Sequence, residues 1–158
     1  MAEKLSTIGV ATVAVIATPP ERARLYFRYR PPRIPVASDG DLVIHRAYGL
    51  PNVEMTPEVW GTVEGLLDGL VRQEGVRETG AAGWAELDRR EGFEWTDTDM
   101  ADRVRHQVQL TGQFLIDREG IVRWSNIEGA QDGLAGLEKF PTEEDILAAA
   151  ALLDGGQA

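Results

Sequence analysis

The stretch GQFLIDREGIVRW, residues 112–124, contains two β-rich runs on either side of a short loop. The runs cover residues 113–117 and 121–125, and the loop is Arg118-Glu119-Gly120. A short loop that ends in glycine between two such runs predicts an antiparallel β-hairpin.

A helix is predicted after this hairpin, from Thr142 to Leu153. Thr142 is a natural N-cap, and three acidic residues follow it in the first turn, where they complement the helix dipole. Four apolar residues on one face of the helix are expected to pack on the core: Ile146, Leu147, Ala150 and Leu153.

A second β-rich run lies near the start of the chain, at residues 10–17 (VATVAVIA). A short, continuous apolar run of this kind is typical of a central strand in a parallel sheet. The prolines at 19 and 20 predict a helix from about Pro20 to Arg30, and a brief strand follows at Ile34–Ala37. Asp39 or Asp41 is expected to cap a short helix through Tyr48. With a helical start before the first strand, the order predicts a mixed α/β sheet flanked by helices.

Residues 51–111 are predicted to be helical and differ in charge from their surroundings. Apolar spacing predicts helices at 57–74, 84–90 and 98–106. The net charge is +3 over residues 1–50, −7 over 51–111 and −6 over 112–158. A shift of this kind is typical of an inserted segment.

The composition of the chain excludes or disfavours several classes of function. The chain has 158 residues, which is enough for one domain with a core, and a net charge of −10. Such an acidic chain disfavours binding to nucleic acid. The chain contains no cysteine, so its residues form no disulfide, thiolate or Cys-ligated metal site. No run is long enough for a membrane span, and we interpret the apolar run Ile8–Ala17 as a strand rather than a signal peptide. We therefore expect a cytoplasmic protein with no membrane partner.

Three stretches resemble the alkyl hydroperoxide reductase and thiol-specific antioxidant family, which is peroxiredoxin-like and belongs to the thioredoxin superfamily. Val13–Ala23 is similar to the family's second strand and following helix. Ile34–Asp39 and His45–Gly49 resemble its P-x-x-S-D and R-A-Y-G stretch, and Gly112–Trp124 resembles its hairpin. Together the matching parts cover residues 1–50 and 112–154, with residues 51–111 as a helical insertion.

The resemblance implies a single thioredoxin-like domain over residues 1–158, lacking the family's first strand and active-site loop. Met1–Leu5 resembles the tail of the helix that follows the reactive cysteine, so the residues for thiol chemistry are missing. Thr111 and Gly112 stand where the family carries a cis-proline or an arginine beside that cysteine, and they are our candidates for the edge of the active site. We predict no catalytic residue, cofactor or metal ligand.

The family implies antioxidant activity, as a peroxide reductase or thiol–disulfide oxidoreductase, and we expect this chain to be inactive or incomplete in that reaction. The alternative is a non-catalytic binding module whose open sheet edge pairs with a partner strand or a second copy. A third interpretation is a truncated gene product or a misassigned start codon.

Other candidate side chains favour structural interpretations. His45 and His106 lie in separate elements, and we expect them to be half-buried or on a surface rather than metal ligands. We expect the acidic clusters 143–145 and 97–102 to serve helix termini, and the four tryptophans to pack in cores. The basic cluster at Arg22, Arg24, Arg28, Arg30 and Arg33 is expected to contact the acidic segment 51–111, within the chain or between subunits.

Overall fold

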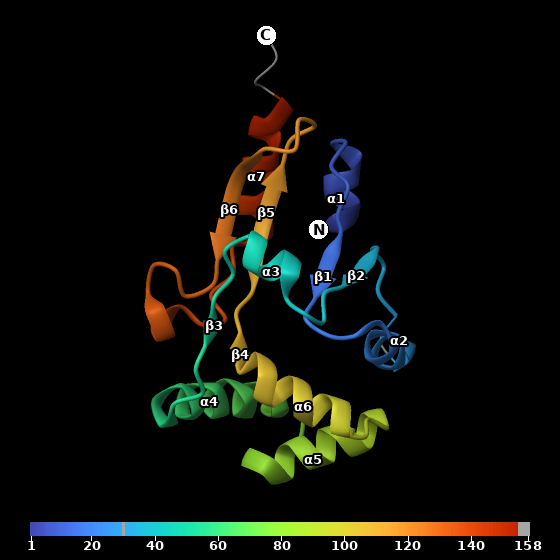
Figure 1. The fold of residues 1–158 in the computed structure, drawn as a ribbon, viewed down its shortest axis with the longest axis vertical. Coiled ribbons are helices and arrows are strands. Elements are labelled where there is room, and N and C mark those ends of the chain that lie inside the picture. Colours follow the sequence, from blue (N-terminus) through green and yellow to red (C-terminus); the bar gives the residue numbers. More distant parts are fainter. Residues whose placement is uncertain (30, 155–158) are drawn as a thin grey trace. The chain divides into compact units, whose positions relative to one another are not determined.

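A computed structural model describes residues 1–29 and 31–154, and these form a mixed α/β protein (Figure 1). The first part of the chain forms α1 (Ala2–Thr7), β1 (Ala14–Ile16), α2 (Pro20–Tyr29), β2 (Val36–Ser38) and α3 (Val43–Ala47). The middle part forms β3 (Asn52–Val53), α4 (Pro57–Gln73), α5 (Gly80–Glu91), α6 (Asp97–His106) and β4 (Val108–Gln109). The last part forms β5 (Gly112–Ile116), β6 (Val122–Ile127), a short 3-10 helix (Gly133–Gly136) and α7 (Glu143–Asp154).

The described residues fall into two compact units. Unit 1 consists of Met1–Pro20, Pro32–Pro51 and the chain from Leu110 onward. Unit 2 consists of Glu21–Pro31 and Asn52–Gln109. Nearly all of the predicted insertion therefore lies in unit 2, together with most of α2.

Unit 1 contains the two predicted strand pairs. β1 and β2 are parallel, with Ala14 opposite Val36 and Ile16 opposite Ser38, and α2 connects them in sequence. β5 and β6 form the antiparallel hairpin, with Leu115 opposite Trp124. Both predictions are confirmed. The prediction of one continuous mixed sheet is wrong for the described residues, because β1–β2, β5–β6 and the short pair β3–β4 are three separate two-stranded sheets.

The first strand is shorter than its apolar run. Gly9 has a left-handed φ of +78°, and Val10 N–H donates to the Leu5 carbonyl, so the chain still follows the turn after α1 at this point. The interpretation of residues 10–17 as a central, doubly covered strand is wrong. Only β2 pairs with β1 in the described part of the chain, and Val13 is 60% exposed.

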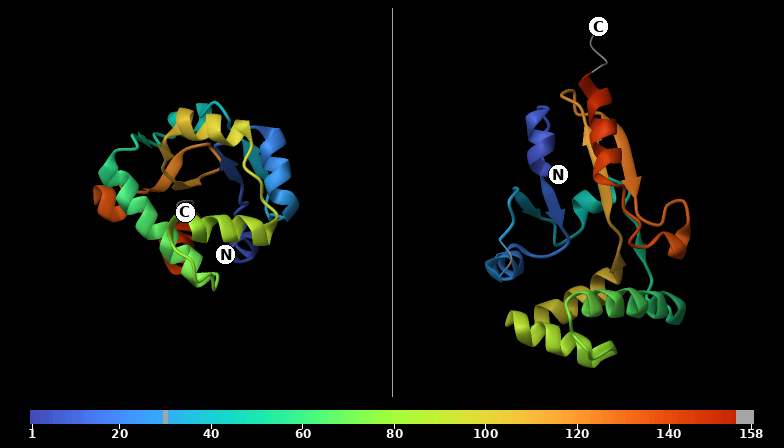
Figure 2. Two further views of the ribbon diagram at one scale, coloured as in Figure 1. Left: turned by 90° about the horizontal axis from the view of Figure 1, so that it is seen from below. Right: turned by 180° about the vertical axis from the view of Figure 1, so that it is seen from behind.

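The core of unit 1 joins both ends of the chain. Leu5 of α1, Leu115 of β5 and two residues of α7, Ile146 and Ala150, are buried together. Half-buried apolar side chains surround this cluster: Val10, Trp124, Leu147, Ala149 and Leu153. Figure 2 shows α7 against one face of the β5–β6 hairpin. The predicted apolar face of the last helix is therefore confirmed.

The turns and helix termini follow the local sequence signals. The Thr142 hydroxyl accepts a bond from Asp145 N–H, and the Asp145 carboxylate accepts one from Thr142 N–H, as expected for an N-cap. In the hairpin loop, Asp117 accepts bonds from Glu119 N–H and Ile121 N–H. Gly120 has a φ of +81°, which explains the glycine that ends this loop.

Unit 2 consists mainly of helices. α4 matches its predicted range, α5 begins four residues earlier than predicted, and α6 matches within one residue. Val71 of α4 is fully buried, and α5 approaches it closely at Gly83. A Cβ at Gly83 would lie 2.8 Å from Val71 Cγ1 and 2.7 Å from the Glu78 carbonyl oxygen. This position therefore has no room for a side chain.

Candidate functional site

Thr111 and Gly112, the predicted edge of the active site, lie where β5 begins. Thr111 is exposed, and both its backbone groups bond to Glu128 at the end of β6. Thr111 N–H donates to Glu128 Oε2 over 2.9 Å, and Glu128 N–H donates to the Thr111 carbonyl over 2.9 Å. The hydroxyl of Thr111 is left outside this pairing, so the residue acts here through its backbone.

Glu128 is a buried residue that the sequence analysis missed. Only 8% of it is exposed, and its second oxygen, Oε1, accepts a bond from Glu138 N–H over 2.8 Å. The carboxylate therefore joins the start of β5 to the loop that follows β6. No motif marks it, because both partners are backbone N–H groups distant in sequence.

The packing around position 112 leaves no room for a side chain, so the residue there is glycine. A Cβ at this position would lie 2.5 Å from Leu50 Cδ2 and 2.8 Å from Phe114 Cε2. Phe114 in turn meets Tyr48 edge to face, with the ring centroids 4.9 Å apart. The structure thus brings the candidate Gly112 into an apolar cluster with the segment after α3.

The outer edge of β1 has no partner strand among the described residues. Ala14 N–H donates to the Pro35 carbonyl and the Ile16 carbonyl accepts from Asp39 N–H, so residues 14 and 16 face β2. Neighbouring peptide groups of a strand point in opposite directions, so the Val13 carbonyl, both backbone groups of Val15 and the Ala17 N–H point away from β2.

β5 has a similar open edge. Glu128 N–H donates to the Thr111 carbonyl, so the backbone of Thr111 points toward β6. In the register of the hairpin, the backbone groups of every second residue after Thr111 point the same way. Residues 113 and 115 thus face β6, while the backbone groups of Gly112, Phe114 and Ile116 point to the opposite side. Figures 1 and 2 show β1 between β2 and β5, so the two open edges lie on the sides of β1 and β5 that face each other.

Asp39 and His45 form a buried pair next to the carboxyl end of β2. Asp39 Oδ2 lies 2.7 Å from His45 Nδ1, and only 7% of each residue is exposed. Asp39 also accepts bonds from the backbone N–H groups of Val43 and His45, both over 2.9 Å. The N-cap residue of α3 is Leu42, so the prediction of Asp39 or Asp41 at that position is wrong, but the Asp39 carboxylate still accepts bonds from N–H groups of the first turn.

The electrostatics of Asp39 favour its charged form. Burial raises the pKa of this carboxyl, but hydrogen bonds from the His45 ring and from backbone N–H groups outweigh it, so the pKa lies below its ordinary value of 3.8. His45 is thereby held in one orientation.

Both histidines are more deeply buried than predicted. His106 at the end of α6 is 6% exposed and belongs to unit 2, whereas His45 belongs to unit 1. No group of three or more ligating side chains is present within the described residues.

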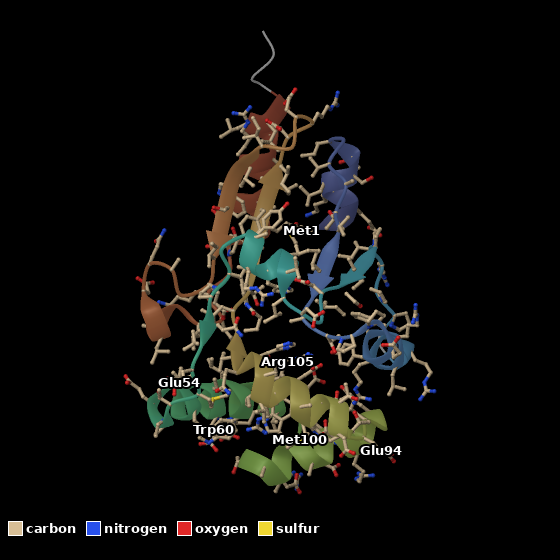
Figure 3. All side chains as sticks on the ribbon, in the orientation of Figure 1. Met1, Glu54, Trp60, Glu94, Met100 and Arg105 are labelled. Atoms are coloured by element: carbon tan, nitrogen blue, oxygen red, sulfur yellow. The ribbon has the colours of Figure 1, made fainter. Side chains whose placement is uncertain are left out.

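The contact predicted between the basic cluster and the acidic segment is confirmed for Arg22. Its Nε forms an ion pair with Asp99 Oδ1, and its Nη2 donates to the Glu94 carbonyl over 2.9 Å (Glu94 is labelled in Figure 3). The guanidinium also lies over the Phe93 ring, 4.6 Å from its centroid. All four residues belong to unit 2. Arg24, Arg28 and Arg33 are exposed, and Arg30 lies outside the described residues.

The pKa of Asp99 reflects these contacts. Burial raises the pKa, and the combined hydrogen bonds from Thr96 and Arg22 lower it below the ordinary value. Asp99 also closes the capping box of α6 with Thr96. The acidic residues at the start of α6 and α7 thus serve helix termini and ion pairs, as expected; Glu143, for example, pairs with Lys4 and the N-terminal amine.

The tryptophans differ in their surroundings. Trp124 packs against the core of unit 1, as predicted. In unit 2, Arg103 lies over the ring of Trp60, and the Trp84 indole nitrogen is buried without a hydrogen-bond partner. Trp95 is 55% exposed and donates to Asp88, so core packing is wrong for this residue.

Comparison of the chain with protein-family models, with curated proteins and with solved structures finds no match. Within the described residues, no helix is both long enough and apolar enough to cross a membrane.

Proposed function

We propose that this chain is a peroxiredoxin-like protein of the alkyl hydroperoxide reductase and thiol-specific antioxidant family, with a thioredoxin-like frame and no thiol chemistry of its own. One observation carries the proposal. A parallel pair linked by a helix, β1–α2–β2, is followed by an antiparallel hairpin and a terminal helix that packs on it. The three stretches that resemble the family lie in or next to these elements.

The chemistry of the residues present supports an inactive member. A thiol peroxidase needs a thiolate that attacks the peroxide and becomes a sulfenic acid. The chain has no cysteine, so that nucleophile cannot form from these residues. A cytoplasmic location is part of the proposal, and its support is that Leu5 and Val10 pack as part of the core of unit 1.

A peroxidase assay tests the catalytic half of this proposal. The purified chain is mixed with hydrogen peroxide and dithiothreitol, and peroxide consumption is followed against buffer. We expect no turnover above the uncatalysed rate. Turnover that scales with protein concentration would overturn the assignment, because it would require a nucleophile other than cysteine.

As a second candidate function, we propose that the chain is a binding module that accepts a strand at the open edge of β1. Its support is that the Val13 carbonyl, both backbone groups of Val15 and the Ala17 N–H point away from β2, while no described strand pairs with them. An exposed, uncharged strand edge is a template for pairing with another chain. The occupant is a partner strand or a second copy of this chain.

Two variants at one position test the second candidate. Proline at Val15 removes an N–H that points away from β2, so Val15→Pro blocks strand addition and spares the β1–β2 ladder. Val15→Thr is the matched control, because it keeps the N–H and the β-branched shape. Sedimentation over a range of concentrations, with and without candidate partners, should show association that only Val15→Pro abolishes. A protein that stays monomeric and binds nothing would contradict the proposal.

A further inference from the structure

We infer that the open edges of β1 and β5 together accept one extended, uncharged peptide segment from a partner protein, which pairs with both strands at once. This inference rests on the second candidate function and specifies the partner. The two edges belong to the same unit, and Figures 1 and 2 show them on the facing sides of their strands.

The hydrogen-bonding groups on these edges define the kind of partner. On the side of β1 the free edge consists of the Val13 carbonyl, both backbone groups of Val15 and the Ala17 N–H. On the side of β5 it consists of the N–H and C=O groups of Gly112, Phe114 and Ile116. Only an extended polypeptide offers complementary groups on both of its own sides at strand spacing. Each row spans five residues, so the segment needs about five residues, roughly 17 Å of strand.

The direction of the two strands also suits an inserted strand. Figure 1 shows β1 and β5 running in opposite directions. A strand between them is thus parallel to one neighbour and antiparallel to the other, and both patterns form complete ladders. The inserted strand would join β2, β1, β5 and β6 into one five-stranded sheet.

Charge and polarity define the partner's side chains. No charged residue occurs in residues 8–18 or 110–116, so a charged segment would lose hydration without gaining an ion pair there. On β5, Leu115 faces the buried core and Phe114 faces Tyr48, so apolar groups cover both faces beside the edge. The partner segment should therefore be apolar and β-branched on both faces.

Two further features support an occupant. β1 and β5 carry no lysine or proline, the residues that usually block edge pairing, whereas β6 has a bulge at the charged Arg123. In addition, the hydroxyl of Thr12, two residues before β1, is buried without a hydrogen-bond partner. A strand beside β1 brings backbone acceptors to this region.

The test uses a dye-labelled heptapeptide with five alternating valine and isoleucine residues and a lysine at each end. Binding is measured by fluorescence anisotropy, and amide exchange by NMR. We expect binding that slows exchange at both Val15 and Phe114. Val15→Pro should weaken the affinity about tenfold and Val15→Thr should leave it unchanged, because only proline removes the backbone donor. A peptide with N-methylated central residues, and one with a central aspartate, should bind at least about tenfold more weakly.

The other outcomes separate this inference from the proposal beneath it. Protection at Val15 without protection at Phe114 would overturn simultaneous pairing and leave strand addition at β1. The parent protein could instead dimerise and bind no peptide, while the Val15→Pro variant is monomeric. That result would overturn the partner inference and support pairing with a second copy. A monomer that binds no peptide would overturn both. If Val15→Pro fails to fold, the N-methylated peptide still tests backbone pairing, because it removes N–H donors from the peptide and leaves the protein unchanged.

Discussion

Asp39 and His45 are buried side by side, with Asp39 Oδ2 2.7 Å from His45 Nδ1. The same carboxylate accepts bonds from two backbone N–H groups of α3. One side chain, directly after β2, thus satisfies N–H groups in the first turn of α3 and orients a histidine next to the strand pair. This charged group explains how a five-residue helix keeps its place beside β1 and β2.

Acid should weaken unit 1 through Asp39. The pKa of Asp39 is lower in the folded chain than its ordinary value of 3.8, so the folded state binds fewer protons than the unfolded state. The stabilisation is present above that value and is lost as the pH falls through the folded pKa. Urea unfolding measured from pH 7 to pH 2.5 should show a falling free energy that Asp39→Asn makes flatter. An equal slope in Asp39→Asn and the parent would contradict this account, and Asp41→Asn, in the same loop but exposed, is the control.

The Arg22–Asp99 ion pair should stabilise unit 2. The two side chains are only 8% and 12% exposed, and removal of one partner leaves the other charge buried. We expect Arg22→Ala to lower the free energy of unfolding by about 3 kcal/mol. A double-mutant cycle with Asp99→Ala should give a coupling of about 1 kcal/mol or more. Arg24→Ala, on the exposed face of the same helix, should change stability by less than about 0.5 kcal/mol. Additive effects of Arg22→Ala and Asp99→Ala would show that the pair contributes nothing.

Glu128→Gln should destabilise unit 1 although it changes the shape of the side chain little. Glu128 accepts bonds from Thr111 N–H and Glu138 N–H through separate oxygens. A glutamine keeps one acceptor and turns its amide donor toward the other N–H, at a cost of about 1–3 kcal/mol. Thermal unfolding measures the loss, and the exposed Glu144→Gln serves as the control. Equal melting temperatures for the two variants would argue against the role of Glu128.

Two helical glycines should respond to alanine in opposite directions. At Gly83 a Cβ meets Val71 and the Glu78 carbonyl, so Gly83→Ala should destabilise unit 2 by about 1–3 kcal/mol. At Gly61 a Cβ meets open space, so Gly61→Ala should stabilise α4 by about 0.5–1 kcal/mol. Urea unfolding of both variants tests the contact between α4 and α5. A stable Gly83→Ala protein would mean that the helices do not approach as described.

The sequence predicted the elements whose signals are local. The Thr142 cap and the acidic first turn locate α7, and the loop ending at Gly120 locates the hairpin. β3 and β4 were missed because a two-residue strand has no readable period. The pairing of β1 was overestimated because an uncharged apolar run looks the same whether one or two strands flank it. The burial of Glu128 could not be predicted from the sequence, because its hydrogen-bond partners are backbone groups distant in the chain.

Exchange of the β1 amides tests the open edge most directly. Hydrogen–deuterium exchange by NMR on the free protein compares Val15 N–H, which points away from β2, with Ala14 N–H, which is bonded to the Pro35 carbonyl. The account predicts fast exchange at Val15 and slow exchange at Ala14 and Asp39. Equal protection at Val15 and Ala14 would contradict it, because the outer edge of β1 would then already be paired.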